Sequence, residues 1–383
     1  MSTAKTASPA FLSKKATDSN AVYGRQIAFT AAFLLPATKL LEAPSILAKY
    51  AAGDLLLPAL LHFLLQGLLL GGVLFAVSRS EIPLFERMKN AIGKWSYVFY
   101  ALFAAYYLMS AVLPILDFEK FVYAVFFDTE SSVFAFAFFF LLSAFICMKG
   151  LKSVGRSADL CVFLFLLPFL ALLLMSLWEV DFTRLLPLFG TEFSDSFDAF
   201  KLTIPHFSDV VLLLPLLGNY KYKKGDSPKI IIGYSFGAFF TLFFLAVFFG
   251  TYSSIAPRVH YAFSKIAQYF PALNVMGRVD LIFVYLLSIV LLFVTCLPLL
   301  YTTEYLATLF KTDKKLLFSL ALNATMFAFT LFFNKYYNSI YGFFNAYLPL
   351  TFILIADMVP LFFLFLPKKR KRTKGEAYEK RTR

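Results

Sequence analysis

The sequence predicts an all-α polytopic membrane protein with about ten transmembrane helices and with both termini in the cytoplasm. Of its 383 residues, 60% are hydrophobic, 50 are phenylalanine and only 15% are charged. A soluble domain of this length needs more polar surface, whereas a chain surrounded by lipid does not. Long apolar segments separated by short charged loops indicate the same fold class.

Ten apolar segments follow one another along the chain. Most are close to the length of about 20 residues that a spanning helix requires, and the fourth and sixth are shorter. The segments lie at roughly 27–49, 55–78, 96–116, 133–148, 159–178, 205–220, 230–252, 280–301, 316–334 and 342–366.

Basic residues are concentrated in every second loop and in the tail at 367–383, while the other loops are acidic or poor in lysine. Under the positive-inside rule, this alternation places the polar lead-in at 1–22 and the tail in the cytoplasm. The net charge of +13 is therefore an orientation signal that favours an anionic lipid surface, and we expect no nucleic acid partner. The basic loops contain Arg79, Arg87, Lys89 and Lys94, then Lys149, Lys152 and Arg156, then Lys221, Lys223, Lys224 and Lys229, and finally Lys311, Lys314 and Lys315.

The first segment contains two prolines and two charged residues within one apolar run. Pro36 and Pro44 each remove a helix hydrogen bond, so the backbone between them is a candidate for local unwinding. Lys39 and Glu42 lie in that interval, and a charge at membrane depth usually faces a cavity or a partner. The alternative is a helix that ends near Leu41, with both charges at the lipid headgroups.

The chain divides into two halves, 23–178 and 205–366, joined by an external connection at 179–204. The second half opens with a segment that is also broken by proline, at Pro205 and Pro215. Two interrupted helices at matching places in two halves are the best sequence indication of a binding site near the middle of the membrane.

Two aspartates are candidates for carrying a proton or binding an ion. Asp209 lies one turn deeper than His206, which we expect to be interfacial, and Lys39 is one possible partner for its carboxylate. Asp357 in the tenth segment is either a second coupling site or a helix-end residue. His62 and Gln66, spaced i,i+4, indicate interhelical hydrogen bonding.

The sequence contains no enzyme signature: it has no phosphate-binding glycine loop and no HExxH motif. Cys147, Cys161 and Cys296 lie in apolar runs at unrelated spacings, which indicates neither a disulfide framework nor a metal site. We therefore expect a protein that is not an enzyme and that needs no metal or cofactor.

Three stretches resemble the spore germination permease family, the B subunits of germinant receptors within the amino acid/polyamine/organocation superfamily. IPHFSDVVLLLPLL from Ile204, followed by a lysine-rich loop, is similar to that family's sixth helix. SKIAQYFPALNVMGRVDLIFVYLLSI from Ser264 is similar to the external segment leading into helix eight through an arginine and an acidic residue, here Arg278 and Asp280. VGRSADLCVFLFLLPFLALLL from Val154, with RLLPLFG from Arg184, resembles the fifth helix and its exit.

The resemblance implies a five-plus-five inverted repeat, LeuT-like, with a small-molecule pocket among helices one, three, six and eight. Where relatives often carry glycines in helix one, this chain has Pro36-Ala37-Thr38-Lys39. The ligand-binding residues implied on this basis are Ala37, Thr38, Lys39, Glu42, Tyr106, Asp209, Leu213, Pro215, Tyr285 and Ser288, with Asp209 and Asp357 for proton or ion coupling.

Three functions follow as hypotheses. The first is a germinant receptor subunit in the spore inner membrane that binds a small nutrient, an amino acid, and signals through an A-type membrane subunit and a C-type lipoprotein. The second is a proton-coupled secondary transporter of amino acids in the bacterial plasma membrane. The third is a structural membrane subunit with a vestigial pocket. The first two share a fold and a pocket, so the sequence alone does not separate them.

Overall fold

The computed structural model describes residues 22–127, 136–178, 180–186, 190–268, 280–312 and 314–366. The predicted basic tail, Arg278 and all but the last residue of the predicted lead-in lie outside these ranges. Every regular element within them is helical, which confirms the all-α prediction.

Within the described residues, each of the ten predicted apolar segments contains helix. Seven of the described helices are long and apolar enough to cross a membrane, and the others that belong to predicted segments are shorter or interrupted. The first half contains α2 (Gly24–Ala37), α3 (Ala43–Ala51), α4 (Leu56–Ser78), α5 (Leu84–Ile92), α6 (Ser96–Val122), α7 (Ala137–Lys149) and α8 (Leu151–Ser176). The second contains α9 (Phe193–Phe207), α10 (Asp209–Asn219), α11 (Asp226–Tyr252), α12 (Ala262–Gln268), α14 (Asp280–Leu309), α15 (Lys315–Phe333), α16 (Tyr337–Phe352), the π-helical turn η7 (Ile353–Met358) and α17 (Val359–Phe362).

The first predicted segment is one helix interrupted in its middle. Pro36 lies in the last turn of α2, and Pro44 lies in the first turn of α3, where a missing N–H costs nothing. The backbone is not helical between Ala37 and Ala43, as the prolines predict. The alternative, a helix that ends near Leu41 with Lys39 at the headgroups, is wrong, because the helix resumes and the Lys39 side chain is 0% exposed.

The sixth segment is longer than predicted. It runs as α9 and α10 over Phe193–Asn219, and the break lies at Ser208 with φ −78° and ψ 58°. Pro205 therefore lies inside α9 instead of starting the segment, and part of the predicted external connection at 179–204 is helix. The polar residues of FSDSFDAF concealed this half-helix, whose other face packs against α3, α4 and α16.

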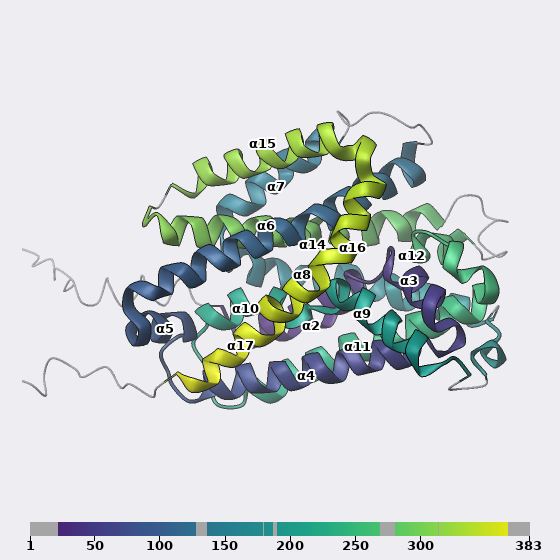
Figure 1. Ribbon diagram of the computed structural model, residues 1–383, viewed down its shortest axis with the longest axis horizontal. Coiled ribbons are helices and arrows are strands. Elements are labelled where there is room, and N and C mark those ends of the chain that lie inside the picture. The colour runs from purple at the N-terminus through teal and green to yellow at the C-terminus, as the bar shows by residue number, and fades with distance from the viewer. Residues whose placement is uncertain are drawn as a thin grey trace, which may run out of the picture.

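The helices stack in layers with the interrupted ones in the middle (Figure 1). α6 packs on α14 and α7 on α15 on one side of them, while α4 packs on α11 on the other. Each of these pairs joins a segment of the first half to the segment at the matching place in the second. Two repeats related by a pseudo-two-fold axis produce such pairing, although the inverted repeat itself stays a prediction.

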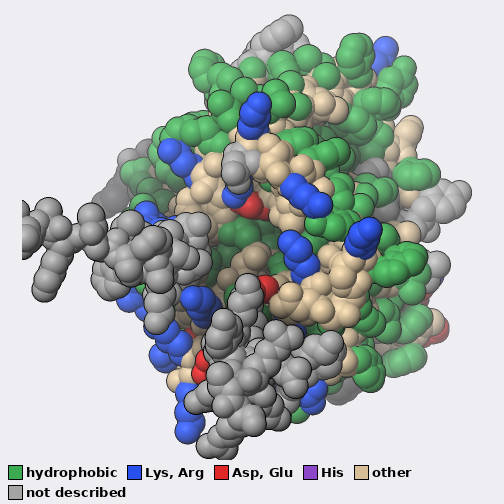
Figure 2. All heavy atoms as spheres, turned by 90° about the vertical axis from the view of Figure 1, so that its left-hand side faces the viewer, with side chains coloured by type: hydrophobic (Ala, Val, Ile, Leu, Met, Phe, Trp, Pro, Cys, Tyr) green, Lys and Arg blue, Asp and Glu red, His purple; other side chains and the backbone are tan. Residues whose placement is uncertain are grey.

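The basic loops meet at one end of the bundle. Figure 2 shows lysine and arginine side chains gathered on this face. Both described ends of the chain lie here as well: Lys223 Nζ is 5.4 Å from the ring centroid of Tyr23, and Arg79 Nη1 donates to the Leu364 carbonyl at 2.9 Å. The predicted even number of spans requires both termini to lie on one side.

Cysteine labelling tests whether the basic end is cytoplasmic. Lys224 and Ser254 are exposed near opposite ends of α11, and the three native cysteines are buried. In sealed right-side-out vesicles, an impermeant maleimide should label the Ser254→Cys variant and should label Lys224→Cys only after permeabilisation. Labelling of Lys224→Cys in intact vesicles would show that the basic end faces outward and that the predicted orientation is wrong.

Candidate functional site

A cavity of about 120 Å³ lies between the two interrupted helices and the helices packed beside them. One ordered water needs on the order of 10–15 Å³ by this measure, so the cavity has room for a small solute. Its lining comprises Ala37, Thr38, Leu41 and Glu42 at the first break, Tyr106, Met109, Ser110, Leu113, Pro114 and Asp117 on α6, Pro205, His206, Ser208, Val211 and Leu212 at the second break, Leu291, Val294, Thr295 and Pro298 on α14, and Phe352.

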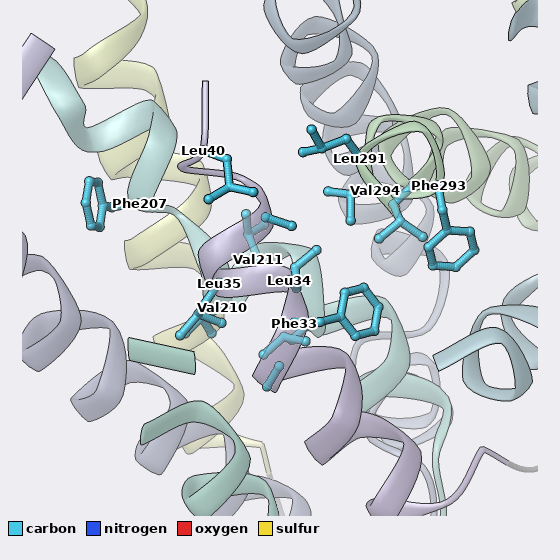
Figure 3. Close-up of a cluster of buried hydrophobic side chains, with 14 of the residues drawn as sticks. Phe33, Leu34, Leu35, Leu40, Phe207, Val210, Val211, Leu291, Phe293 and Val294 are labelled. Carbon is cyan, nitrogen blue, oxygen red and sulfur yellow. The ribbon is translucent and has the colours of Figure 1, made fainter. Parts of the chain in front are cut away.

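The lining residues of α6 form a single stripe. They recur at intervals of three and four residues from Tyr106 to Asp117, so they share one helix face. Figure 3 shows an apolar cluster to which the end of α2 contributes Phe33 and Leu34 and α14 contributes Leu291 and Val294. The end of α2 thus packs on α14 beside the first break, with the ring centroids of Phe33 and Phe293 6.4 Å apart.

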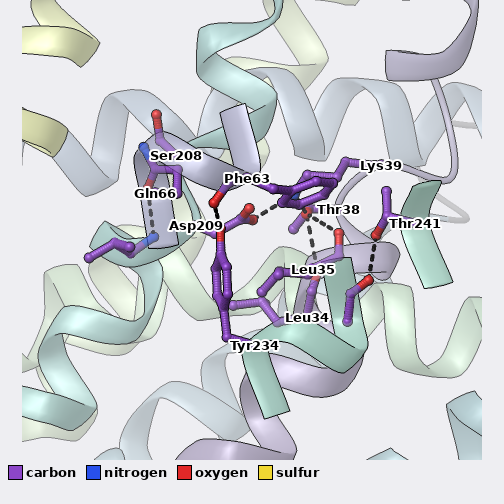
Figure 4. A network of polar contacts seen from close by, with 12 residues as sticks. Leu34, Leu35, Thr38, Lys39, Phe63, Gln66, Ser208, Asp209, Tyr234 and Thr241 are labelled. Carbon is purple, nitrogen blue, oxygen red and sulfur yellow. Dashed lines mark hydrogen bonds and ion pairs between the residues drawn. The ribbon is translucent and has the colours of Figure 1, made fainter. Parts of the chain in front are cut away.

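A buried ion pair joins the two breaks behind the cavity lining. Lys39 Nζ lies 2.6 Å from Asp209 Oδ1, and the two side chains are 0% and 1% exposed (Figure 4). Lys39 Nζ also donates to Thr38 Oγ1 at 2.9 Å and lies 4.9 Å from the ring centroid of Phe207. The second carboxylate oxygen of Asp209 has no hydrogen-bond partner among the described residues. Each charge makes the burial of the other tolerable, since either one alone would be an uncompensated charge in an apolar core.

Gln66 on α4 connects the second break to the tenth segment. Its Nε2 donates to Asp357 Oδ1 at 2.7 Å, and its Oε1 accepts from the Val210 N–H at 3.1 Å. Asp357 lies in the π-helical turn η7, a departure from α-helix that frequently occurs at functional sites. His62, one turn away, stacks on Phe200 with ring centroids 4.0 Å apart. The interhelical hydrogen bonding predicted for His62 and Gln66 is therefore present, with a separate partner for each residue.

Aromatic side chains close the side of the cavity that leads to the basic end. The Tyr107 hydroxyl donates to the Val211 carbonyl at 2.5 Å, which fixes α6 to the start of α10. The Tyr107 ring lies 5.2 Å from that of Tyr301 and 5.7 Å from that of Tyr305, and all three side chains are buried. On α14, Tyr301 and Tyr305 lie beyond the last lining residue, Pro298, in the direction of the basic loop that contains Lys311.

The opposite side of the cavity is acidic. Glu42 Oε2 lies 3.1 Å from His260 Nδ1, and Asp117 Oδ1 accepts from the Tyr337 hydroxyl at 2.6 Å. The first break is also tied to α12, because the Leu40 and Leu41 carbonyls accept the N–H groups of Phe263 and Ala262, each at 3.2 Å. The carbonyls that interruption of the helix leaves free are thus satisfied by an outer segment.

Of the residues implied by the resemblance, the structure brings Ala37, Thr38, Glu42 and Tyr106 to the cavity. Lys39 and Asp209 lie just behind it, each next to a lining residue. The others do not line the cavity. Leu213 and Pro215 are buried in α10, and Asp357 binds Gln66. On α14, Ser288 donates to the Val284 carbonyl of its own helix, and Tyr285 is 60% exposed on the outside.

Sequence reasoning missed several lining residues. His206 lines the cavity and is not interfacial, because α9 extends well beyond it on the outer side. Ser110 and Thr295 gave no signal of their own, since each is a single polar residue in an apolar run. Asp117 gave none because it lies just past the predicted third segment, beside the charged residues Glu119 and Lys120. Only the helix face on which they lie, set by packing, brings them to the cavity.

Interrupted helices around a solute-sized cavity, together with seven helices of membrane-spanning length in the all-helical part of the chain that the structure describes, define a permease-like integral membrane protein. The model of the spore permease family, described as spore germination protein, matches residues 40–338, and the chain belongs to that family. The resemblance inferred from the three stretches is thereby confirmed. Comparison with curated proteins found no match.

Proposed function

We propose that this germination permease is the nutrient-binding subunit of a germinant receptor in the spore inner membrane, and that it binds an amino acid in the cavity between its interrupted helices. The observation that carries the proposal is the cavity itself, which is small, lined by five segments and built around both breaks. Membership of the spore germination protein family supports the biological setting.

The ion pair behind the cavity gives a route from binding to signalling. Thr38 and Ser208 line the cavity, and their neighbours Lys39 and Asp209 form the pair. A ligand that moves either break relative to the other therefore changes the 2.6 Å contact between Lys39 Nζ and Asp209 Oδ1. Through α12, which is hydrogen bonded to the first break, the same movement reaches the outer surface. The proposed receivers of this signal are an A-type membrane subunit and a C-type lipoprotein.

The buried carboxylates support a second candidate, a proton-coupled amino acid transporter. Asp209 and Asp357 are buried, and Gln66 contacts both Asp357 and the backbone next to Asp209. Intramembrane carboxylates connected in this way are the usual components of a proton relay.

Filling the cavity tests the proposed function. A phenylalanine in place of Ser110 introduces a ring into the lining, so we expect spores carrying Ser110→Phe to lose their response to nutrient. Ala101→Phe is the matched control, since Ala101 is on the same helix but exposed on its outer face. The measurement is nutrient-triggered germination, with the amounts of the protein and of its copurifying subunits determined in parallel. A full response from Ser110→Phe spores containing normal amounts of the complex would favour the structural-subunit hypothesis.

A further inference from the structure

The side chains of the described lining offer hydrogen-bond acceptors and few donors. The serine and threonine side chains of the lining each have one O–H group, and each already donates it to the backbone carbonyl three or four residues earlier, at distances from 2.8 to 3.1 Å. They belong to Thr38, Ser110, Ser208 and Thr295. These hydroxyls therefore present only lone pairs to a ligand.

The charged groups of the lining are both carboxylates. Asp117 is 6% exposed, and its Oδ1 accepts from Tyr337, while no described residue donates to its Oδ2. Glu42 keeps one oxygen free of His260. The described lining contains no lysine or arginine. Lys39, which follows the lining residue Thr38, is 0% exposed and bound to Asp209.

Other charges near Asp117 and Glu42 do not make the net charge at this end of the cavity positive. Lys120 is electrostatically coupled to Asp117, Glu119 and Glu42, but it is outside the lining, with its Nζ 3.2 Å from the ring centroid of Tyr337. Three carboxylates thus face one lysine. The remaining side-chain donors of the lining are His206, a neutral imidazole of which offers one N–H, and Tyr106, whose hydroxyl interacts with Ser208.

We infer that the ligand of this cavity is an organic cation, which binds through an ammonium group held by Asp117 and needs no carboxylate. This inference rests on the proposed function and names the class of nutrient. An ammonium has three donors and no acceptor, which matches a lining of lone pairs and carboxylates. A ligand carboxylate finds no free cation here and faces two charges of its own sign. Basic amino acids and simple amines satisfy these conditions, whereas sugars and anionic nutrients do not.

Four probes of similar size test the ligand's ammonium and carboxylate groups independently. L-alaninamide has the ammonium alone, L-alanine has ammonium and carboxylate, propionate has the carboxylate alone, and propionamide has neither. Binding to the purified full-length protein is measured by the rise in its apparent unfolding temperature with probe concentration. L-alaninamide should bind at least about tenfold more tightly than propionamide, since a charge-assisted hydrogen bond supplies that factor. L-alanine should bind no more tightly than L-alaninamide.

Variants of Asp117 test whether its carboxylate causes the preference for L-alaninamide. Asp117→Asn keeps an oxygen for the Tyr337 hydroxyl but should abolish the tenfold preference for the cation, while Asp117→Glu should retain it. Asp181→Asn, in an exposed loop where Asp181 pairs with Arg184, is the control and should behave as wild type. The cation inference would be overturned if L-alanine or propionate bound more tightly than L-alaninamide, or if Asp117→Asn kept the tenfold preference for L-alaninamide over propionamide. Either result would leave the proposed function standing. Binding of none of the four probes would count against both proposals.

Discussion

Lys39→Met should lower the stability of the folded protein by about 3–5 kcal/mol, because it leaves the Asp209 carboxylate buried without its cation. Asp209→Leu should cost a similar amount, since the ammonium of Lys39 then has no counter-ion. The double variant Lys39→Met/Asp209→Leu should recover most of this loss, because it removes both charges together. The measurement is unfolding of the purified protein in detergent, analysed as a double-mutant cycle.

Arg25→Met is the control for this cycle. It breaks the pair between Arg25 and Asp159, whose side chains are 66% and 32% exposed, and should cost under about 1 kcal/mol. If Lys39→Met costs no more than Arg25→Met, the two breaks are not held together by the ion pair.

Gly233→Ala should prevent α11 from packing against α2 and destabilise the bundle by about 1–3 kcal/mol. A Cβ at Gly233 would lie 2.3 Å from the carbonyl oxygen of Ala28, and backbone atoms cannot move aside as a flexible side chain does. One turn further on, a Cβ at Gly237 would lie 2.9 Å from the Ala31 carbonyl oxygen. Because α2 carries the first break, this close approach also positions Lys39.

Gly71→Ala is the matched control, since a Cβ at Gly71 in α4 has nothing within 4 Å. It should be neutral or slightly stabilising, because alanine is favoured over glycine in a helix by about 1 kcal/mol. The measurement is the apparent unfolding temperature and the yield of monodisperse protein. Equal effects of the two substitutions would mean that the contact between α2 and α11 is looser than the structure shows.

The interruptions could be predicted because proline acts locally. Pro36 and Pro44 remove hydrogen bonds and restrict their neighbours wherever the helix lies in the bundle. The second break was only partly predictable: Pro205 and Pro215 indicated it, but the helix is interrupted at Ser208 between them. There, the Val210 N–H donates to Gln66 on α4, and the Asp209 side chain pairs with Lys39 in the first break.

The site residues depend on tertiary packing that a single sequence does not contain. The contact of Lys39 with Asp209 spans 170 residues, and the sequence offered it as one possibility among several. Tyr285 illustrates the opposite outcome: α14 is apolar on all sides, so no pattern indicates which face meets the cavity, and Tyr285 lies outside. Asp117 was missed for the same reason, because its orientation follows from the packing of α6 on α14.

The most direct test of the central claim is binding and uptake of a labelled mixture of the common amino acids by the purified chain in proteoliposomes, with and without an inward proton gradient. We expect saturable binding that Ser110→Phe abolishes and Ala101→Phe preserves, and no accumulation when the gradient is applied. Gradient-driven accumulation would make the protein a transporter that uses the same cavity. Binding that is unchanged in Ser110→Phe would contradict the assignment of the cavity between the interrupted helices as the ligand site.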